Sequence, residues 1–81
     1  SYLVKASLLR KAGKTTEARK VLESGNEATG GTSAEIHNAL GFAYLNAKDY
    51  ERARQHARKA YELGIPLPGL RDQLAAAGYP L

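Results

Sequence analysis

The sequence contains no cysteine. Without thiols it can form neither a disulfide nor a thiolate metal site, and cysteine usage leaves the compartment open. No apolar run approaches the ~18–20 residues that a membrane-spanning helix needs. The only histidines, His37 and His56, fall on different predicted helices, and neither has a helix-spaced second histidine. The sequence therefore predicts no metal site and no cofactor.

Motifs typical of enzymes are also missing. Residues 13–15, Gly-Lys-Thr, resemble the end of a phosphate-binding loop. That loop needs a glycine five residues earlier, after a strand, but Leu8 stands there inside a predicted helix. The chain shows no Ser-His-Asp arrangement in a suitable turn and no pair of carboxylates in an apolar run. We therefore predict a turn at Gly13 and no enzymatic activity.

The charge is positive but has no block of one sign. The net charge is +4, from twelve basic and eight acidic residues that are interspersed along the chain. Such mixing is more typical of solvated helix surfaces than of a phosphate-binding surface. The densest basic group, Arg52, Arg54, Arg58 and Lys59, lies on the fourth predicted helix and contains i, i+3 and i, i+4 pairs with Glu51 and Glu62.

Apolar residues recur at helical spacing through nearly the whole chain. With 81 residues, 43% of them hydrophobic, the chain has the composition of one small soluble domain. The pattern predicts five helices: Tyr2–Ala12, Thr15–Ser24, a third from the 32–35 segment to the turn at Ala47–Lys48, a fourth from Tyr50 to Gly64, and Leu70–Ala77.

Several residues are suited to begin or end these helices. Gly25 is expected to stop the second helix, and the glycine-rich stretch 25–31 is expected to be a loop. Thr32 and Glu35 have the spacing of a capping box. Asp49 is a suitable N-cap for the fourth helix, whose buried face is predicted to consist of Tyr50, Ala53, Ala57, Ala60 and Tyr61.

A shift of about 35 residues overlays the chain on itself, placing Leu9 on Tyr44 and Ala18 on Ala53. The second copy carries a recognisable set of residues: Leu40-Gly41, Tyr44, Asp49-Tyr50, Ala53, Ala60 and Pro66. This pattern resembles the tetratricopeptide repeat, a helix pair of ~34 residues. The resemblance implies an all-α, right-handed superhelical solenoid of antiparallel helix pairs. It divides the chain into repeat 1 (about 1–25), a loop (25–32), repeat 2 (about 33–66) and a capping helix (about 68–78).

The sequence departs from the family pattern at a few positions. His37 stands where the family often has Trp, and it is expected to be a packing residue. Ala57 stands where the family usually has a large aromatic side chain, and Tyr61 is expected to fill the space beside it. In the first repeat, Lys5 takes the place of an apolar residue.

The resemblance implies a protein–protein interaction scaffold that holds a partner's peptide or protein in a concave groove, lined by the first helix of each pair. The groove residues it implies are Leu3, Ser7, Arg10, Glu35, Asn38, Phe42, Leu45 and Asn46, with Asp72 as an addition. Phe42 lies off the buried stripe of its helix and is the expected anchor. Alternatively, it packs against Leu70 or Leu74 of the capping helix. Some family members hold chaperone tails with Lys and Asn, but Leu3, Ser7 and Ala39 stand at those positions, so that ligand is not expected.

Two other functions stay open. The basic group Arg52, Arg54, Arg58 and Lys59 could bind nucleic acid or another anionic polymer, and the chain could be a spacer in an assembly. The sequence begins inside a predicted helix, which favours a segment of a longer protein with further repeats, or self-association through the exposed first helix. The end after Pro66 resembles the ends of bacterial repeat proteins.

Overall fold

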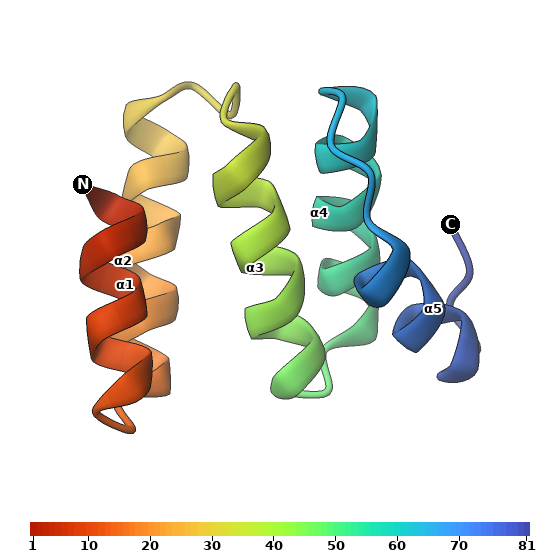
Figure 1. Ribbon diagram of the computed structural model, residues 1–81, viewed down its shortest axis with the longest axis horizontal. Helices are drawn as coiled ribbons and strands as arrows, with labels where there is room; N and C mark the ends of the chain where they lie inside the picture. The colour runs from red at the N-terminus through yellow and green to blue at the C-terminus, as the bar shows by residue number, and fades with distance from the viewer.

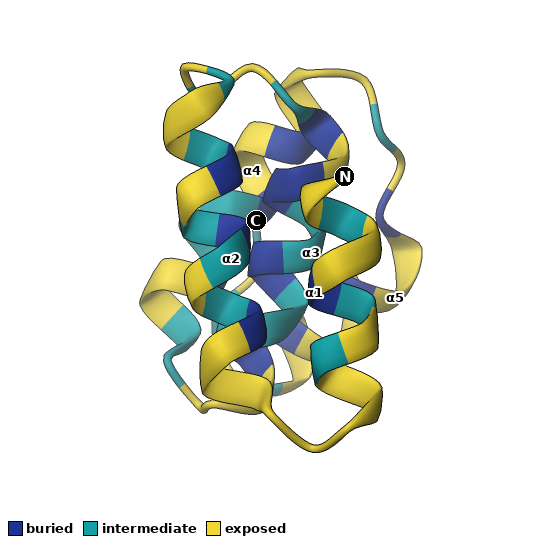
Figure 2. Cartoon of the chain, turned by 90° about the vertical axis from the view of Figure 1, so that its left-hand side faces the viewer, coloured by how far each residue is buried: buried dark blue, intermediate teal, exposed yellow.

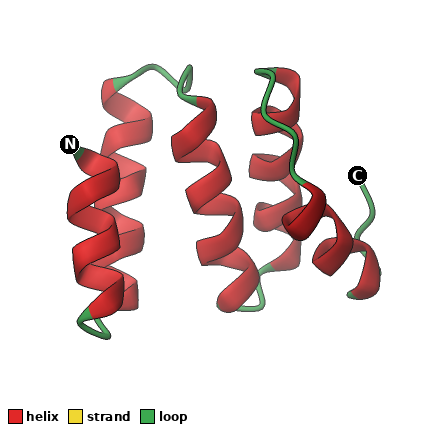
Figure 3. Ribbon diagram, in the orientation of Figure 1, coloured by secondary structure: helices red, strands yellow, loops and turns green.

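The computed structural model describes residues 1–81 as five α-helices without a strand (Figure 3). The helices are α1 (Tyr2–Lys11), α2 (Thr15–Ala28), α3 (Ala34–Asn46), α4 (Tyr50–Glu62) and α5 (Pro68–Ala76). Figure 1 shows two antiparallel pairs, α1 with α2 and α3 with α4. A loop then runs in front of α4 and leads to the short α5, which extends to the right of α4. The predicted all-α fold with five helices is confirmed.

Short-range signals set most of the helix ends. The predicted turn between α3 and α4 is present, and Lys48 adopts a left-handed conformation there with φ of 62°. The Asp49 side chain caps α4 by accepting a hydrogen bond from the Arg52 amide at 3.3 Å. Pro68 occupies the first turn of α5, where its missing amide hydrogen costs nothing.

The prediction for Gly25 is wrong, because α2 continues past it to Ala28. Gly25 is buried, and a Cβ atom at this position would lie 2.8 Å from Cγ of Tyr2 and 3.0 Å from Cδ1 of Ile36. Glycine here allows the beginnings of α1 and α3 to approach the α2 backbone. The predicted loop 25–31 is therefore shortened to the few residues between Ala28 and Ala34.

The N-cap of α3 also lies one residue later than predicted. The Ser33 hydroxyl oxygen accepts a hydrogen bond from the Ile36 amide at 3.2 Å, and the same hydroxyl donates to the Glu35 carboxylate at 3.3 Å. The Thr32 hydroxyl instead donates to the Thr29 carbonyl at 2.7 Å. Thr32 thus completes the end of α2, which leaves Ser33 to start α3.

The core consists of two apolar clusters on opposite sides of α3. Figure 2 shows buried segments on the inner sides of the helices, with exposed residues covering the outer faces of α1 and α2. The first cluster joins the first helix pair to α3 and contains Ala6, Ala18, Leu22, Ile36 and Leu40. The second joins α3, α4 and α5 and contains Leu45, Ala53, Ala57, Ala60, Leu67, Leu70 and Leu74. Because α3 contributes to both clusters, it is the central element of the fold.

Small residues allow α3 and α4 to cross closely. A Cβ atom at Gly41 would lie 3.6 Å from the Ala53 carbonyl oxygen and 2.6 Å from Cδ2 of Leu70. Leu70 therefore reaches from α5 onto the crossing point. The prediction that Tyr61 is buried beside Ala57 is wrong: Tyr61 is exposed, and the cluster around Ala57 includes Leu70 instead.

Candidate binding groove

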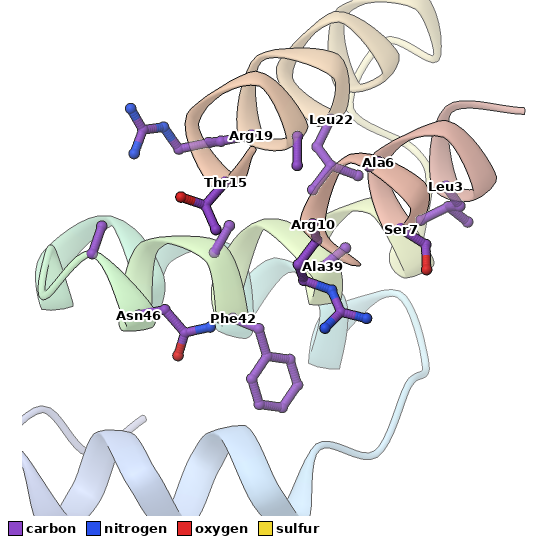
Figure 4. A pocket seen from close by; sticks show the side chains of 13 residues that line it. Leu3, Ala6, Ser7, Arg10, Thr15, Arg19, Leu22, Ala39, Phe42 and Asn46 are labelled. Atoms are coloured by element: carbon purple, nitrogen blue, oxygen red, sulfur yellow. The ribbon is translucent and has the colours of Figure 1, made fainter. Parts of the chain in front are cut away.

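A cavity of about 550 Å³ lies between the first helix pair and α3. Figure 4 shows side chains from three helices around it. The lining comprises Leu3, Ala6, Ser7 and Arg10 of α1, Thr15, Ala18, Arg19 and Leu22 of α2, and Ala39, Phe42, Ala43 and Asn46 of α3 with the following Ala47. The cavity is thus an opening in the contact between two helix pairs.

The structure brings together many of the residues that were predicted to face a partner. Those that line the cavity are Leu3, Ser7, Arg10, Phe42 and Asn46. Asn38 and Phe42 are four residues apart, so they share one face of α3, and Glu35 lies on the same side. We call this face of α1 and α3 the groove face; it consists of Leu3, Ser7, Arg10, Glu35, Asn38, Phe42 and Asn46.

Leu45 does not belong to the groove face. Its side chain is only 8% exposed and lies in the cluster formed with α4 and α5. The prediction did not place Leu45 against the capping helix, whereas in the structure Leu45 belongs to the same buried cluster as Leu70 and Leu74 of α5. Asp72, the additional candidate, is exposed on α5 and does not line the cavity.

Phe42 has two neighbourhoods. It lines the cavity, and it also packs, half-buried, against the cluster of α3, α4 and α5. In Figure 4 its ring points away from the first helix pair and toward the ribbon of α5. Phe42 thus lies on the predicted binding face and also packs toward the capping helix, as the alternative prediction stated. Its ring separates the cavity from the capping helix.

Alanines account for the cavity, which the sequence analysis did not predict. Ala39 and Ala43 lie on the α3 face toward the first pair, and Ala6 and Ala18 lie on the other side of the cavity. Both alanines line the cavity, but their side chains are too short to fill the space between the pairs. The sequence signal that could have predicted this cavity is the presence of alanines on both of the helix faces that meet there.

The cavity is lined by two cations and by no carboxylate. The charged residues in its lining are Arg10 and Arg19. The ion pairs of the molecule, Arg52–Asp49, Arg54–Glu51 and Lys59–Glu62, involve neither of them. The Arg19 guanidinium lies over the Tyr44 ring, 5.6 Å from its centroid. Arg10 is thus the cation of the groove face that has no partner within the chain.

Comparison with protein families matches residues 34–64 to the tetratricopeptide repeat. The matched segment contains α3, the turn at Lys48 and α4. Residues 34–64 are thus similar to a tetratricopeptide repeat, and the helical architecture fits a repeat of this type. No curated protein and no solved structure matches the chain. The assignment of the first helix pair as a second, more divergent repeat stays a prediction, as do the repeat boundaries and the right-handed superhelix.

Tetratricopeptide repeats generally mediate protein–protein interactions and typically act as non-enzymatic scaffolds. No helix of the chain is long and apolar enough to cross a lipid bilayer. The family match therefore points toward protein partners, and the groove face lies partly on the first helix of the matched repeat.

His37, within the repeat, forms a hydrogen-bonded pair that sequence spacing did not reveal. Its Nε2 lies 2.8 Å from the Gly31 carbonyl oxygen, and its Nδ1 lies 2.9 Å from Nδ1 of His56. Because a carbonyl only accepts, we assign the proton of His37 to Nε2, so His56 donates through Nδ1. No group of three or more potential metal ligands occurs in the chain. The two imidazoles thus bind each other across α3 and α4.

Tyr44 connects this pair to the first helix pair. Its ring stacks on His56 with centroids 5.6 Å apart, and its hydroxyl donates a hydrogen bond to the Glu23 carboxylate of α2. Burial, followed by the contact with Glu23, raises the pKa of Tyr44. These contacts form a polar seam between α2 and the matched repeat, consisting of Glu23, His37, Tyr44 and His56.

The polar seam predicts a dependence of stability on pH. Burial, reinforced by His37 and opposed by Glu23, holds the pKa of His56 below its ordinary value. The unfolded chain therefore binds this proton at a higher pH than the folded chain. The stabilisation is fully present above the unfolded value of about 6.5 and is lost as the pH falls through the lower folded pKa.

We expect the melting temperature of the wild type to decrease between pH 7.5 and 5.5, and His56→Gln to show a smaller decrease. Arg52 holds the pKa of Asp49 below its usual range by hydrogen bonding, so Asp49 titrates at lower pH and does not interfere. Thermal unfolding by circular dichroism measures both slopes. Equal slopes in the two proteins would show that His56 is not the group responsible.

The basic group on the outer side of the repeat is largely paired. Arg52 binds Asp49 and Arg54 binds Glu51, each at 2.8 Å. Glu62 lies 3.9 Å from Lys59, its i, i+3 neighbour, whereas the i, i+4 spacing had predicted a pair between Glu62 and Arg58. Ion pairs between exposed side chains one helical turn apart add little to stability, because solvent screens them. They nevertheless reduce the positive charge available for an anionic polymer.

Proposed function

We propose that this chain is a scaffold segment that binds a peptide or protein partner on the groove face. The observation that carries the proposal is the cavity of about 550 Å³, which opens between α1 and α3 among residues suited to bind a peptide. Its volume is within the ~300–1,000 Å³ typical of ligand pockets. The lining is mostly apolar, with few polar groups, which is the usual composition of such pockets.

The groove face offers both an anchor and hydrogen-bonding groups. Phe42 is half-buried and held against the core cluster, so it presents its ring to a partner with little loss of conformational freedom. Asn38 and Asn46 flank it on the same side of α3. Their amide groups can donate to and accept from an extended peptide backbone.

The proposal is tested with a pull-down from cells of the source, at low and moderate salt, with wild type beside Phe42→Glu. We expect a protein partner to be retained by the wild type at both salt concentrations and to be lost, at least tenfold, in the variant. Tyr61→Glu is the matched control, because Tyr61 is an exposed aromatic residue outside the groove face.

Circular dichroism of each variant separates loss of binding from loss of folding, and Asn46→Arg blocks the same face at an exposed position. A binder that is retained by both Phe42→Glu and Asn46→Arg but released by salt would overturn the proposal. Such a binder would place the interaction on the basic group Arg52, Arg54, Arg58 and Lys59.

We also propose that the outer face of α1 contacts a further helix, of another repeat or of a second copy. Val4 is 60% exposed there, beside Leu8, and both lie opposite the buried Ala6. In solenoids, such faces are covered by the neighbouring repeat. For the isolated chain, we expect self-association in sedimentation velocity that Val4→Lys weakens. A strictly monomeric wild type at high concentration would exclude the second copy as the partner of this face.

A further inference from the structure

The cavity has a composition that restricts what can occupy it. Its inner walls are formed by small or aliphatic side chains, among them Ala18, Leu22, Ala39 and Ala43. An unfilled apolar space leaves the surrounding atoms without dispersion contacts on one side. A large apolar group would restore these contacts, so the walls favour an aliphatic or aromatic side chain over a polar one.

The charged residues at the cavity restrict the occupant further. The lining has two arginines and no carboxylate. Figure 4 shows the Arg10 side chain directed toward the side on which Phe42 lies, whereas Arg19 extends in another direction. Because Arg19 already lies over the Tyr44 ring, Arg10 is the cation available at the cavity. The carboxylate of the groove face, Glu35, does not line the cavity and accepts a hydrogen bond from Ser33. A guanidinium binds a carboxylate through two parallel hydrogen bonds.

We propose that this cavity receives a large apolar side chain of the partner peptide, and that an adjacent carboxylate of the same peptide pairs with Arg10. The inference rests on the proposed function, because it specifies the peptide that the groove face binds. Charge complementarity favours a carboxylate over a phosphate, since phosphopeptide sites generally use clusters of arginine and the groove face has one. Ser7 and Asn46, which also line the cavity, lie where they can bind the peptide backbone.

The test uses a library of immobilised octapeptides in which every position is varied. We expect the wild type to enrich peptides with a large apolar residue next to Asp or Glu. Arg10→Glu should change the preference for Asp or Glu into one for Lys or Arg, and it should keep the preference for a large apolar residue. A reversal of charge preference cannot come from a structural role of Arg10 alone.

Filling the cavity tests the apolar part of the inference. Ala43→Leu should reduce binding of the enriched peptides at least tenfold, and its melting temperature should be no lower than that of the wild type. Ala75→Leu is the control, because Ala75 is exposed on α5 and far from the lining. If Ala43→Leu proves unstable, methyl chemical shifts of Ala39, Ala43 and Leu22 in the wild type, with and without an enriched peptide, replace it.

The outcomes distinguish this inference from the proposed function. If Phe42→Glu abolishes peptide binding while Ala43→Leu and Arg10→Glu select the same peptides as the wild type, the groove binds peptides and the cavity inference is wrong. The inference is also wrong if the pull-down yields a groove-dependent partner and the wild type enriches no apolar-acidic sequence.

Discussion

Replacing Leu40 with alanine is expected to lower the free energy of unfolding by about 2–5 kcal/mol. Leu40 is 0% exposed and is the largest fully buried side chain of the cluster that joins the first helix pair to α3. The cavity lies beside the same contact between helix pairs. Few neighbouring side chains can therefore move into the space that Leu40→Ala would leave. The contact between the first helix pair and α3 should therefore be weakened.

Urea unfolding followed by circular dichroism measures this change. For a domain of this size, 1 kcal/mol corresponds to roughly 4–8 °C in melting temperature, so the effect is also visible on heating. Leu63→Ala is the matched control: Leu63 is 40% exposed at the end of α4, and the same substitution there should change stability by at most about 0.5 kcal/mol. Similar losses in both variants would mean that Leu40 does not hold the two pairs together.

Introducing the aromatic side chain that the family usually has, as Ala57→Phe, is expected to destabilise the chain by about 1–3 kcal/mol or more. Ala57 is 0% exposed, and the ends of Leu70 and Leu74 occupy the same cluster. Its backbone nitrogen would lie only 3.7 Å from a Cβ atom at Gly41, so α3 and α4 leave no space at this crossing. A phenyl ring would have to displace α5 or separate the two helices.

Gln55→Phe is the control for this experiment, because Gln55 is exposed on the same helix and tests the effect of an added aromatic residue alone. Thermal and urea unfolding of both variants should separate them clearly. A fully stable Ala57→Phe would show that α5 can move to accept the family's usual side chain, and that Leu70 is not required over Gly41.

Much of this fold could be predicted from the sequence, because the signals act over a few residues. Apolar spacing predicted the five helices, and Asp49 was correctly identified as the cap of α4. The residues that resemble a tetratricopeptide repeat lie almost entirely in the segment that the family comparison matches. Helical periodicity and capping depend on neighbours within one turn, so they can be read without knowledge of the remaining chain.

The errors at Gly25 and Thr32 arose where distant partners compete with local signals. Glycine commonly ends a helix, but at Gly25 the close approach of Tyr2 and Ile36 requires a residue without a side chain inside the helix. Thr32 has the spacing of a cap for α3, yet its hydroxyl donates a hydrogen bond to the Thr29 carbonyl at the end of α2. In both cases the local pattern permitted two structures, and packing selected one.

The sequence by itself thus determined the helices, the turn between α3 and α4, and the side of α3 that carries Asn38, Phe42 and Asn46. The tertiary structure decided how far Leu45 and Phe42 are buried, the hydrogen bond between His37 and His56, and the cavity between the helix pairs. The first set follows from the regular geometry of a helix. The second depends on how well side-chain volumes from different helices match across a contact, which no stretch of a single helix contains.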